Sequence, residues 1–308
     1  MLPDFYIIGA QKAGTTTLAA LLKETKGIAI SNPKEPMVFC FDDYEVHRNE
    51  LLHEEAVWNK YRWDGDRERL MARYGDYFVG ADNGALRGEA STTYALSRVA
   101  AGRIAEMTPG AKFIMILRDP VARAWSAYWH CVRKQIATRS FEHEIRFGGA
   151  NLIEFGHYAE QLDRYRRLFS PEQVKVVHFE DLLAGPDAVL RDLLEFLGVK
   201  PPSGPLPKPQ RLNESFYPRF VTLHRAAVAL ARPFSELAAH SSLAPPERGG
   251  GGRAPGGVRG LYRRVCMTGT IPGKMADATR NLLREHYRRV NAGLGEMLGE
   301  DIFGKWGW

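Results

Sequence analysis

The residues best suited to chemistry lie between an apolar run and an amphipathic helix near the start of the chain. In "FYIIGAQKAGTTTLAALLKE", four residues separate Gly9 from Gly14, the spacing of a nucleotide-triphosphate phosphate loop. That loop has a lysine after its second glycine, but here Thr15 follows Gly14 and Lys12 lies inside the loop. A glycine turn that begins a helix offers backbone N–H groups and the positive end of the helix dipole to an anion. The segment therefore predicts a phosphate site with a displaced lysine.

A second set of candidates follows the later strands and bears on the kind of transfer. A Mg²⁺-dependent kinase needs an acid near the loop, and the candidates at strand ends are Asp119, Glu180 and Asp181. Arg118 stands directly before Asp119 and is a poor neighbour for a metal cation. A sulfuryl group carries less negative charge than a terminal phosphoryl group, so protein cations alone can assist its transfer. The displaced lysine and the arginine favour sulfuryl transfer without a metal, and a small-molecule P-loop kinase is the alternative.

Alternating strands and helices must position these residues. Apolar runs next to turn residues predict strands at residues 5–9, 27–31, 85–91, 112–117 and 173–181. Apolar residues at helical spacing predict helices at residues 15–25, 93–107, 120–135, 157–169, 186–199 and 276–298. This order is typical of an α/β fold, with a central, mainly parallel sheet flanked by helices on both faces.

We expect one P-loop-like domain over residues 1–308. Residues 44–74 are strongly charged and predict a helical insertion at the periphery. Residues 245–260 are rich in glycine and predict a mobile loop. The segment 276–308 predicts a closing helix and tail, and it is too small to fold alone.

The composition limits the function classes. The formal net charge of +6 suits an anionic ligand, but the basic residues are spread along the chain, which argues against nucleic-acid binding. Three scattered cysteines show neither a disulfide framework nor a metal-ligand spacing. No apolar stretch reaches the ~20 residues of a membrane span, and the first strand begins too early to leave room for a signal peptide. We therefore expect a cytoplasmic protein with no membrane span.

Several segments together resemble the sulfotransferases that use 3′-phosphoadenosine 5′-phosphosulfate (PAPS). The resemblance is greatest to the branch that includes heparan sulfate N- and 3-O-sulfotransferases and bacterial relatives. It rests on segments in the family's order between residues 5 and 200, and on a closing segment through Trp306: "GAQKAGTT", "NPKEPMVF", "KFIMILRDPVARAWSAYWH" and "GHYAEQLDRYRRLFSPEQVKVVHFEDL". It implies transfer of a sulfuryl group to a hydroxyl, less favourably an amine, of a saccharide, lipid or natural product. The other product would be adenosine 3′,5′-bisphosphate, and no metal would be needed.

The resemblance also implies roles for single residues in binding the donor. Lys12 would contact the oxygen that bridges sulfate and 5′-phosphate. Arg118 and Ser126 would bind the 3′-phosphate, and a guanidinium after a strand suits such an anion. The 5′-phosphate would be held by the Thr15 and Thr16 hydroxyls and by the backbone amides of Ala13, Gly14, Thr15, Thr16 and Thr17.

The base implied by the resemblance is Glu35, which would take the proton of the acceptor hydroxyl. The residues alone favour another interpretation, in which Lys34 and Glu35 form an ordinary solvated pair in a loop. His130 and His178 are the other candidates, because other branches of the superfamily use histidine.

Two departures from the branch limit what the resemblance implies. Ala90 stands where the branch has a lysine between a glutamate and a serine, which weakens the case for a polysaccharide acceptor. A glycine-rich stretch replaces the disulfide-closed loop of the Golgi enzymes, and Arg259 is a faint match to the basic residues of that loop. Without a membrane anchor or this disulfide, the chain resembles a cytoplasmic, bacterial enzyme, and small-molecule, lipid, saccharide and carrier-bound acceptors all stay open. A nucleotide-binding module without catalysis is the non-enzyme alternative.

Overall fold

The computed structural model describes residues 2–43, 46, 63–134, 136–147, 151–202, 204, 206–207, 217–224, 226 and 265–308. Its centre is a sheet of five parallel strands in the order β2-β3-β1-β4-β5. The strands are β1 (Phe5–Gly9), β2 (Ile28–Ile30), β3 (Leu86–Glu89), β4 (Lys112–Leu117) and β5 (Val174–His178). The predicted α/β fold with a mainly parallel sheet is therefore confirmed.

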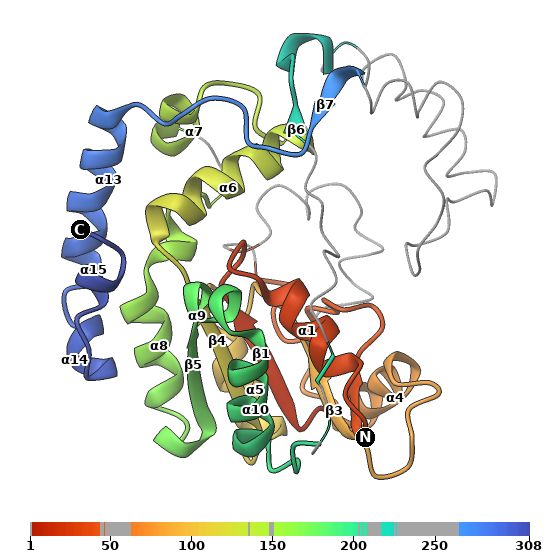
Figure 1. Cartoon of the computed structure of the whole chain (residues 1–308). Helices are drawn as coiled ribbons and strands as arrows, with labels where there is room; N and C mark the ends of the chain where they lie inside the picture. The colour runs from red at the N-terminus through yellow and green to blue at the C-terminus, as the bar shows by residue number, and fades with distance from the viewer. Residues whose placement is uncertain are drawn as a thin grey trace.

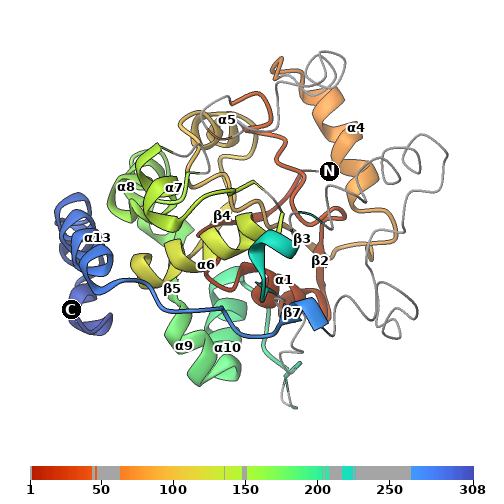
Figure 2. The same ribbon diagram turned by 90° about the horizontal axis from the view of Figure 1, so that it is seen from above.

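Helices cover both faces of this sheet (Figure 2). One face carries α1 (Thr15–Lys23), α9 (Phe179–Ala184) and α10 (Pro186–Leu197). The other carries α4 (Arg67–Tyr77), α5 (Ala100–Met107) and α8 (Tyr158–Arg166). The strand order explains this division, because the chain leaves β1 toward β2 but leaves β3 toward β4 in the opposite direction.

The position of β1 decides where a ligand can bind. β1 is buried along its whole length and pairs with β3 on one side and β4 on the other. The helical connections on its two sides leave in opposite directions, so the loop after β1 lies at the switch point of the sheet, where open α/β sheets bind ligands. Arg118 follows β4, the neighbouring strand, and its backbone therefore ends at the same edge.

A second layer lies beyond that edge. Helix α6 (Pro120–Arg133) leaves the end of β4 and runs toward a short ribbon of β6 (Tyr217–Pro218) and β7 (Met267–Thr268) (Figure 1). It shares an apolar cluster with α7 (Phe141–Phe147) and α13 (Asp277–Val290). The chain closes with α14 (Leu294–Leu298) and α15 (Ile302–Lys305), and the buried Trp306 joins the main core.

Side-chain hydrogen bonds shorten two predicted helices. The helix expected over 93–107 begins only at Ala100, because Ser97 Oγ accepts hydrogen bonds from the N–H groups of Val99 and Ala100. The helix expected over 276–298 is interrupted after Val290. There the buried Asn291 bonds through its side chain to the Ala159 N–H, 3.0 Å away, and to the Gly156 carbonyl, 2.9 Å away.

Two further expectations need correction or fall outside the described residues. The strand expected over 173–181 ends at His178, and Glu180 and Asp181 lie in α9. Within the predicted insertion 44–74, α4 begins at Arg67, where Asp66 caps it by accepting from the Arg69 N–H. Residues 44–45, 47–62 and the loop 245–260 lie outside the described part of the chain.

The close approach of β1 and β3 gives a test of the fold. A Cβ on Gly88 would lie 2.1 Å from the Phe5 ring, so Gly88→Ala should lower the free energy of unfolding by about 1–3 kcal/mol. Urea denaturation measures it. Gly102→Ala is the control, because its Cβ would meet nothing within 4 Å and alanine favours a helix by about 0.5–1 kcal/mol. Equal stabilities of Gly88→Ala and the unsubstituted protein would contradict the packing.

Candidate active site

The loop after β1 turns sharply into α1. Gly14 is the N-cap of α1 with φ 90°, and a Cβ there would lie 3.1 Å from the Phe179 ring. The first backbone bond of the helix runs from the Leu18 N–H to the Gly14 carbonyl, so the N–H groups of Thr15–Thr17 have no acceptor within the helix. The Ala13 N–H already donates to the Ala10 carbonyl, at 3.1 Å. An anion can therefore accept hydrogen bonds from the free N–H groups in the first turn of α1, whereas the N–H of Ala13 is already used.

Arg118 connects the end of β4 to this loop. Its guanidinium donates to the Lys12 carbonyl at 2.8 Å and lies over the Phe179 ring, 4.6 Å from the centroid. The Tyr158 hydroxyl donates to the Arg118 carbonyl at 2.9 Å. Ser126 is buried in α6, and no hydrogen bond joins it to Arg118 in the described part of the chain. The structure therefore brings Arg118 to Lys12 and leaves the expected contact of Arg118 and Ser126 with one phosphate as a prediction.

Positive charge accumulates around Lys12. Burial, followed by the charges of Arg133, Arg118 and Lys134, lowers the pKa of Lys12 from 10.5 to about 8. No acidic side chain pairs with Lys12 among the residues that the structure describes. A buried cation among other cations favours an anionic ligand, because the ligand supplies the missing countercharge.

One face of α6 lies toward this loop. Ser126, His130, Arg133 and Lys134 follow each other at the spacing of one helix face, and Arg133 and Lys134 act on the charge of Lys12. The Arg133 guanidinium lies 3.1 Å from Nδ1 of His130. Burial, followed by the charges of Lys12, Arg133 and Lys134, lowers the pKa of His130 to about 3. His130 is therefore a weak base at neutral pH.

Glu35 is tied to the first turn of α1 by Lys34. The Lys34 ammonium lies 2.6 Å from Glu35 Oε1 and donates to Thr16 Oγ1 at 3.3 Å. The Thr92 hydroxyl donates to the other Glu35 oxygen, Oε2, at 3.1 Å. The pair expected from the residues alone exists, but it is half-buried and reaches the loop.

A second carboxyl lies behind Glu35. Glu89 is fully buried at the end of β3 and accepts hydrogen bonds from Tyr74 and Ser91. Burial raises the pKa of Glu89 to about 7, with these hydrogen bonds opposing the rise and the charge of Glu35 adding to it. Ser91 Oγ also accepts from the Met37 N–H, at 3.0 Å. Glu89 and Ser91 thus help to fix the segment that carries Glu35.

Other candidates have different partners. His178 lies 2.7 Å from Glu300 of the C-terminal tail, and no hydrogen bond or ion pair joins it to Lys12 or Glu35 in the described part of the chain. Asp119 Oδ1 accepts from the N–H groups of Val121 and Ala122, so this candidate metal ligand serves as the N-cap of α6. The described residues contain no group of three or more His, Cys, Asp or Glu side chains suited to a metal. Arg259 lies outside the described residues.

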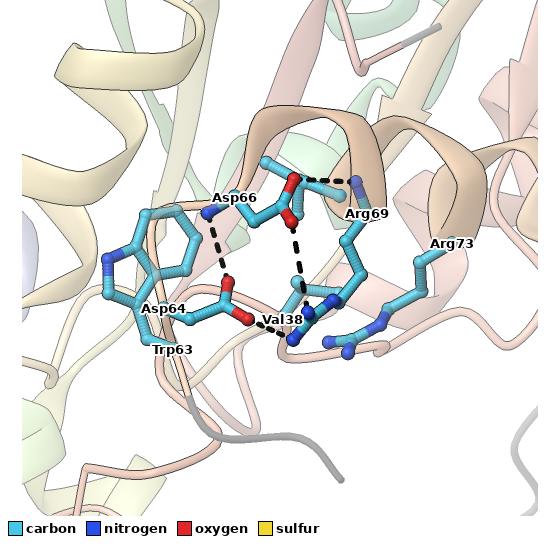
Figure 3. Close-up of a pocket in the computed structure, with 7 residues that line it drawn as sticks. Val38, Trp63, Asp64, Asp66, Arg69 and Arg73 are labelled. Atoms are coloured by element: carbon cyan, nitrogen blue, oxygen red, sulfur yellow. Dashed lines mark hydrogen bonds and ion pairs between the residues drawn. The ribbon is translucent and has the colours of Figure 1, made fainter.

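Two cavities in the described part of the chain lie away from these residues. One of about 700 Å³ lies between α7 and α13, and its lining includes Arg146, Thr279 and His286 but no predicted site residue. Figure 3 shows a much smaller pocket of about 10 Å³ near the start of α4, where Arg69 pairs with Asp64 and Asp66. A volume of that size holds no more than about one water molecule. The proposed donor site therefore rests on the loop and its contacts.

Comparison with known proteins agrees with this geometry. Residues 3–202 match the sulfotransferase family. The chain belongs to this family. A sulfotransferase from Alicyclobacillus acidocaldarius has a crystal structure that is similar, with a TM-score of 0.55 and 30% identity, over 78% of this chain and 96% of that one. The predicted membership of the PAPS-dependent sulfotransferase family is confirmed.

Curated mouse relatives of this sulfotransferase are larger proteins. Bifunctional heparan sulfate N-deacetylase/N-sulfotransferase 4 is 30% identical over 222 residues, which are 65% of this chain and 23% of the relative. Heparan sulfate glucosamine 3-O-sulfotransferase 3B1 is 30% identical over 207 residues, 65% of this chain and 47% of the relative. The chain thus spans less than half the length of these relatives. In its described parts, no helix is both long and apolar enough to cross a bilayer.

Sequence reasoning missed three residues near the loop of this sulfotransferase. Arg133 and Lys134 act on Lys12 from the end of α6, and their helical spacing from Ser126 in "SAYWHCVRK" was the available signal. Glu89 entered the sequence reasoning only as the glutamate before Ala90, and its burial could not be inferred from one sequence. The contacts of Lys34 were equally hidden, because Thr16 is distant along the chain.

The depressed pKa of Lys12 gives a test that needs no substrate. Below about pH 8 Lys12 is protonated in both the folded and the unfolded protein, so the folded state carries the full cost of the buried charge. Lys12→Met should therefore raise the free energy of unfolding at pH 7, by on the order of 3 kcal/mol. Between pH 8 and 10.5 only the unfolded protein keeps this proton, so the unsubstituted protein gains stability and the difference shrinks.

Urea denaturation of both proteins at several pH values measures this difference. Lys23→Met is the control, because Lys23 is exposed in the last turn of α1, and its effect should be small at every pH. A stability difference for Lys12→Met that stays constant with pH would contradict the depressed pKa.

Proposed function

We propose that this sulfotransferase moves a sulfuryl group from PAPS to an acceptor hydroxyl, less favourably an amine, of a saccharide, lipid or natural product. The observation that carries the proposal is the position of the Lys34 ammonium, which contacts both Glu35 and Thr16. This contact supports the proposal because Glu35 and the first turn of α1 share Lys34 as a partner. Two relatives are named as sulfotransferases of heparan sulfate, a saccharide, and this favours a saccharide acceptor here. A cytoplasmic location and a bacterial origin stay predictions.

The residues around the loop fit the phosphates of the donor. The N–H groups of Gly14–Thr17 and the positive end of α1 would hold the 5′-phosphate. The Arg118 guanidinium has five N–H donors, one of which donates to the Lys12 carbonyl. The remaining donors, with Ser126, would bind the 3′-phosphate. Binding of these anions would relieve the repulsion that lowers the pKa of Lys12.

Glu35 and Lys12 would have different roles in the transfer step. PAPS supplies a sulfuryl group activated by its bond to phosphate. Glu35 would take the proton of the acceptor hydroxyl as the acceptor oxygen bonds to sulfur. The bond from sulfur to the bridging oxygen breaks, and its electron pair stays on the 5′-phosphate. Lys12 would stabilise that developing charge, which is greatest in the transition state.

The alternatives are less well supported. A kinase would need an acid for Mg²⁺, and Asp119 is engaged as a helix cap. A binding module without catalysis would bind adenosine 3′,5′-bisphosphate and turn over no acceptor. Transfer of labelled sulfate from PAPS to a panel of saccharides, lipids and phenols, with a chelator present, separates the three functions.

Lys12→Met should lower kcat by about 100-fold and weaken the binding of adenosine 3′,5′-bisphosphate much less. The reason is that the charge of Lys12 matters most while the bridge breaks. Transfer assays and titration calorimetry measure the two effects. Equal losses of rate and affinity would rule out a role at the leaving group.

Glu35→Gln should keep donor binding and lose most of the turnover, by about 100-fold or more, because the amide cannot take the acceptor proton. Glu160→Gln is a matched control, since Glu160 forms an exposed pair with Arg164 on α8, and its kcat should be unchanged. A normal rate for Glu35→Gln would exclude Glu35 as the base.

A further inference from the structure

Lys34 contacts both the proposed base, Glu35, and the turn proposed to bind the 5′-phosphate of the donor. Its ammonium contacts the Glu35 carboxylate at 2.6 Å and the Thr16 hydroxyl at 3.3 Å. Glu35 stands on the acceptor side, and Thr16 belongs to the turn suited to the 5′-phosphate. The Lys34 ammonium is therefore already within hydrogen-bond distance of both groups.

The backbone of Lys34 is held firmly while its side chain remains accessible. The Lys34 carbonyl accepts from the Ala90 N–H at 3.2 Å and from Ser31 Oγ at 3.3 Å. The Lys34 side chain is 26% exposed, so its end can move between partners. Ala90 itself is fully buried and carries no charge. The backbone of Lys34 thus lies beside Ala90, while its ammonium contacts Glu35 and Thr16.

In the proposed step, negative charge moves from Glu35 to the 5′-phosphate, and the Lys34 ammonium lies between these two groups. When the acceptor O–H bond breaks, its proton goes to Glu35 and cancels the carboxylate charge. As the bond between sulfur and the bridging oxygen breaks, its electron pair places negative charge on the 5′-phosphate. A cation between Glu35 and the 5′-phosphate therefore loses its attraction to Glu35 while its attraction to the phosphate grows.

We propose that Lys34 is a catalytic residue that passes from Glu35 to the 5′-phosphate during sulfuryl transfer. This inference rests on the proposed function, because it needs the donor phosphate at the first turn of α1. While Glu35 is charged, the ion pair holds Lys34 back from the phosphate. When Glu35 is neutral, Lys34 donates to the phosphate oxygens and stabilises the leaving group together with Lys12.

Binding of adenosine 3′,5′-bisphosphate tests the exchange without any acceptor. Glu35→Gln imitates the neutral carboxyl and releases Lys34, so it should tighten binding of the bisphosphate by about five- to tenfold. In the K34M background the same substitution should change the affinity less than about twofold. Titration calorimetry on the four proteins of this double-mutant cycle gives the coupling.

The exposed pair of Lys175 and Asp192, 2.7 Å apart, provides a matched control cycle. Lys175→Met and Asp192→Asn should leave the affinity for the bisphosphate unchanged, singly and together. If K34M fails to fold, Lys34→Gln serves in its place, and thermal unfolding checks every variant.

A gain from Glu35→Gln that is as large in the K34M background as in the native one would overturn the inference. Such a result would mean that removal of a negative charge near the ligand is sufficient. The proposed function would survive it, because the bisphosphate still binds. Failure of the unsubstituted protein to bind the bisphosphate would overturn both. The rate gives a second measure, with an expected loss in kcat of about 100-fold for K34M and a partial recovery for Lys34→Arg.

Discussion

The candidate site depends on positive charge gathered around Lys12, which pairs with no acidic side chain among the described residues. Burial and the charges of Arg133, Arg118 and Lys134 bring the pKa of Lys12 down to about 8. Such a cluster destabilises the protein when no anion is bound. Part of the binding free energy of a phosphate at this site is therefore the repulsion that the phosphate removes.

The rest of the structure keeps these cations in place. β1 and β4 pair side by side, which brings the loop after β1 and the residue after β4 to one edge of the sheet. Phe179, after β5, packs against Gly14 and lies under the Arg118 guanidinium. Three neighbouring strands thus contribute to one small volume. The distances between the charges therefore depend on the packing of all three strands.

The sequence was sufficient for the parts of this site that depend on local pattern. The apolar run before Gly9 and the helical spacing after Gly14 predicted the strand, the turn and the helix. Arg118 could be placed at the edge of the sheet because it follows a buried strand. Its partner could not be predicted, since Lys12 lies 106 residues away in the chain. The start of α5 after Ser97 and the end of α13 before Asn291 could not be predicted either, because side-chain hydrogen bonds overrode the helical pattern.

The separation of Glu35 from Lys12 in this site is itself informative. Glu35 pairs with Lys34 and Thr92 rather than with Lys12, and Glu89 lies buried behind it with a pKa of about 7. An in-line transfer has the attacking oxygen on one side of sulfur and the leaving oxygen on the other. A base that paired directly with Lys12 would neutralise the charge needed at the leaving oxygen. Lys34 contacts both Glu35 and Thr16 in the first turn of α1, so in the proposed transfer the carboxylate would lie close to the reacting group without weakening Lys12.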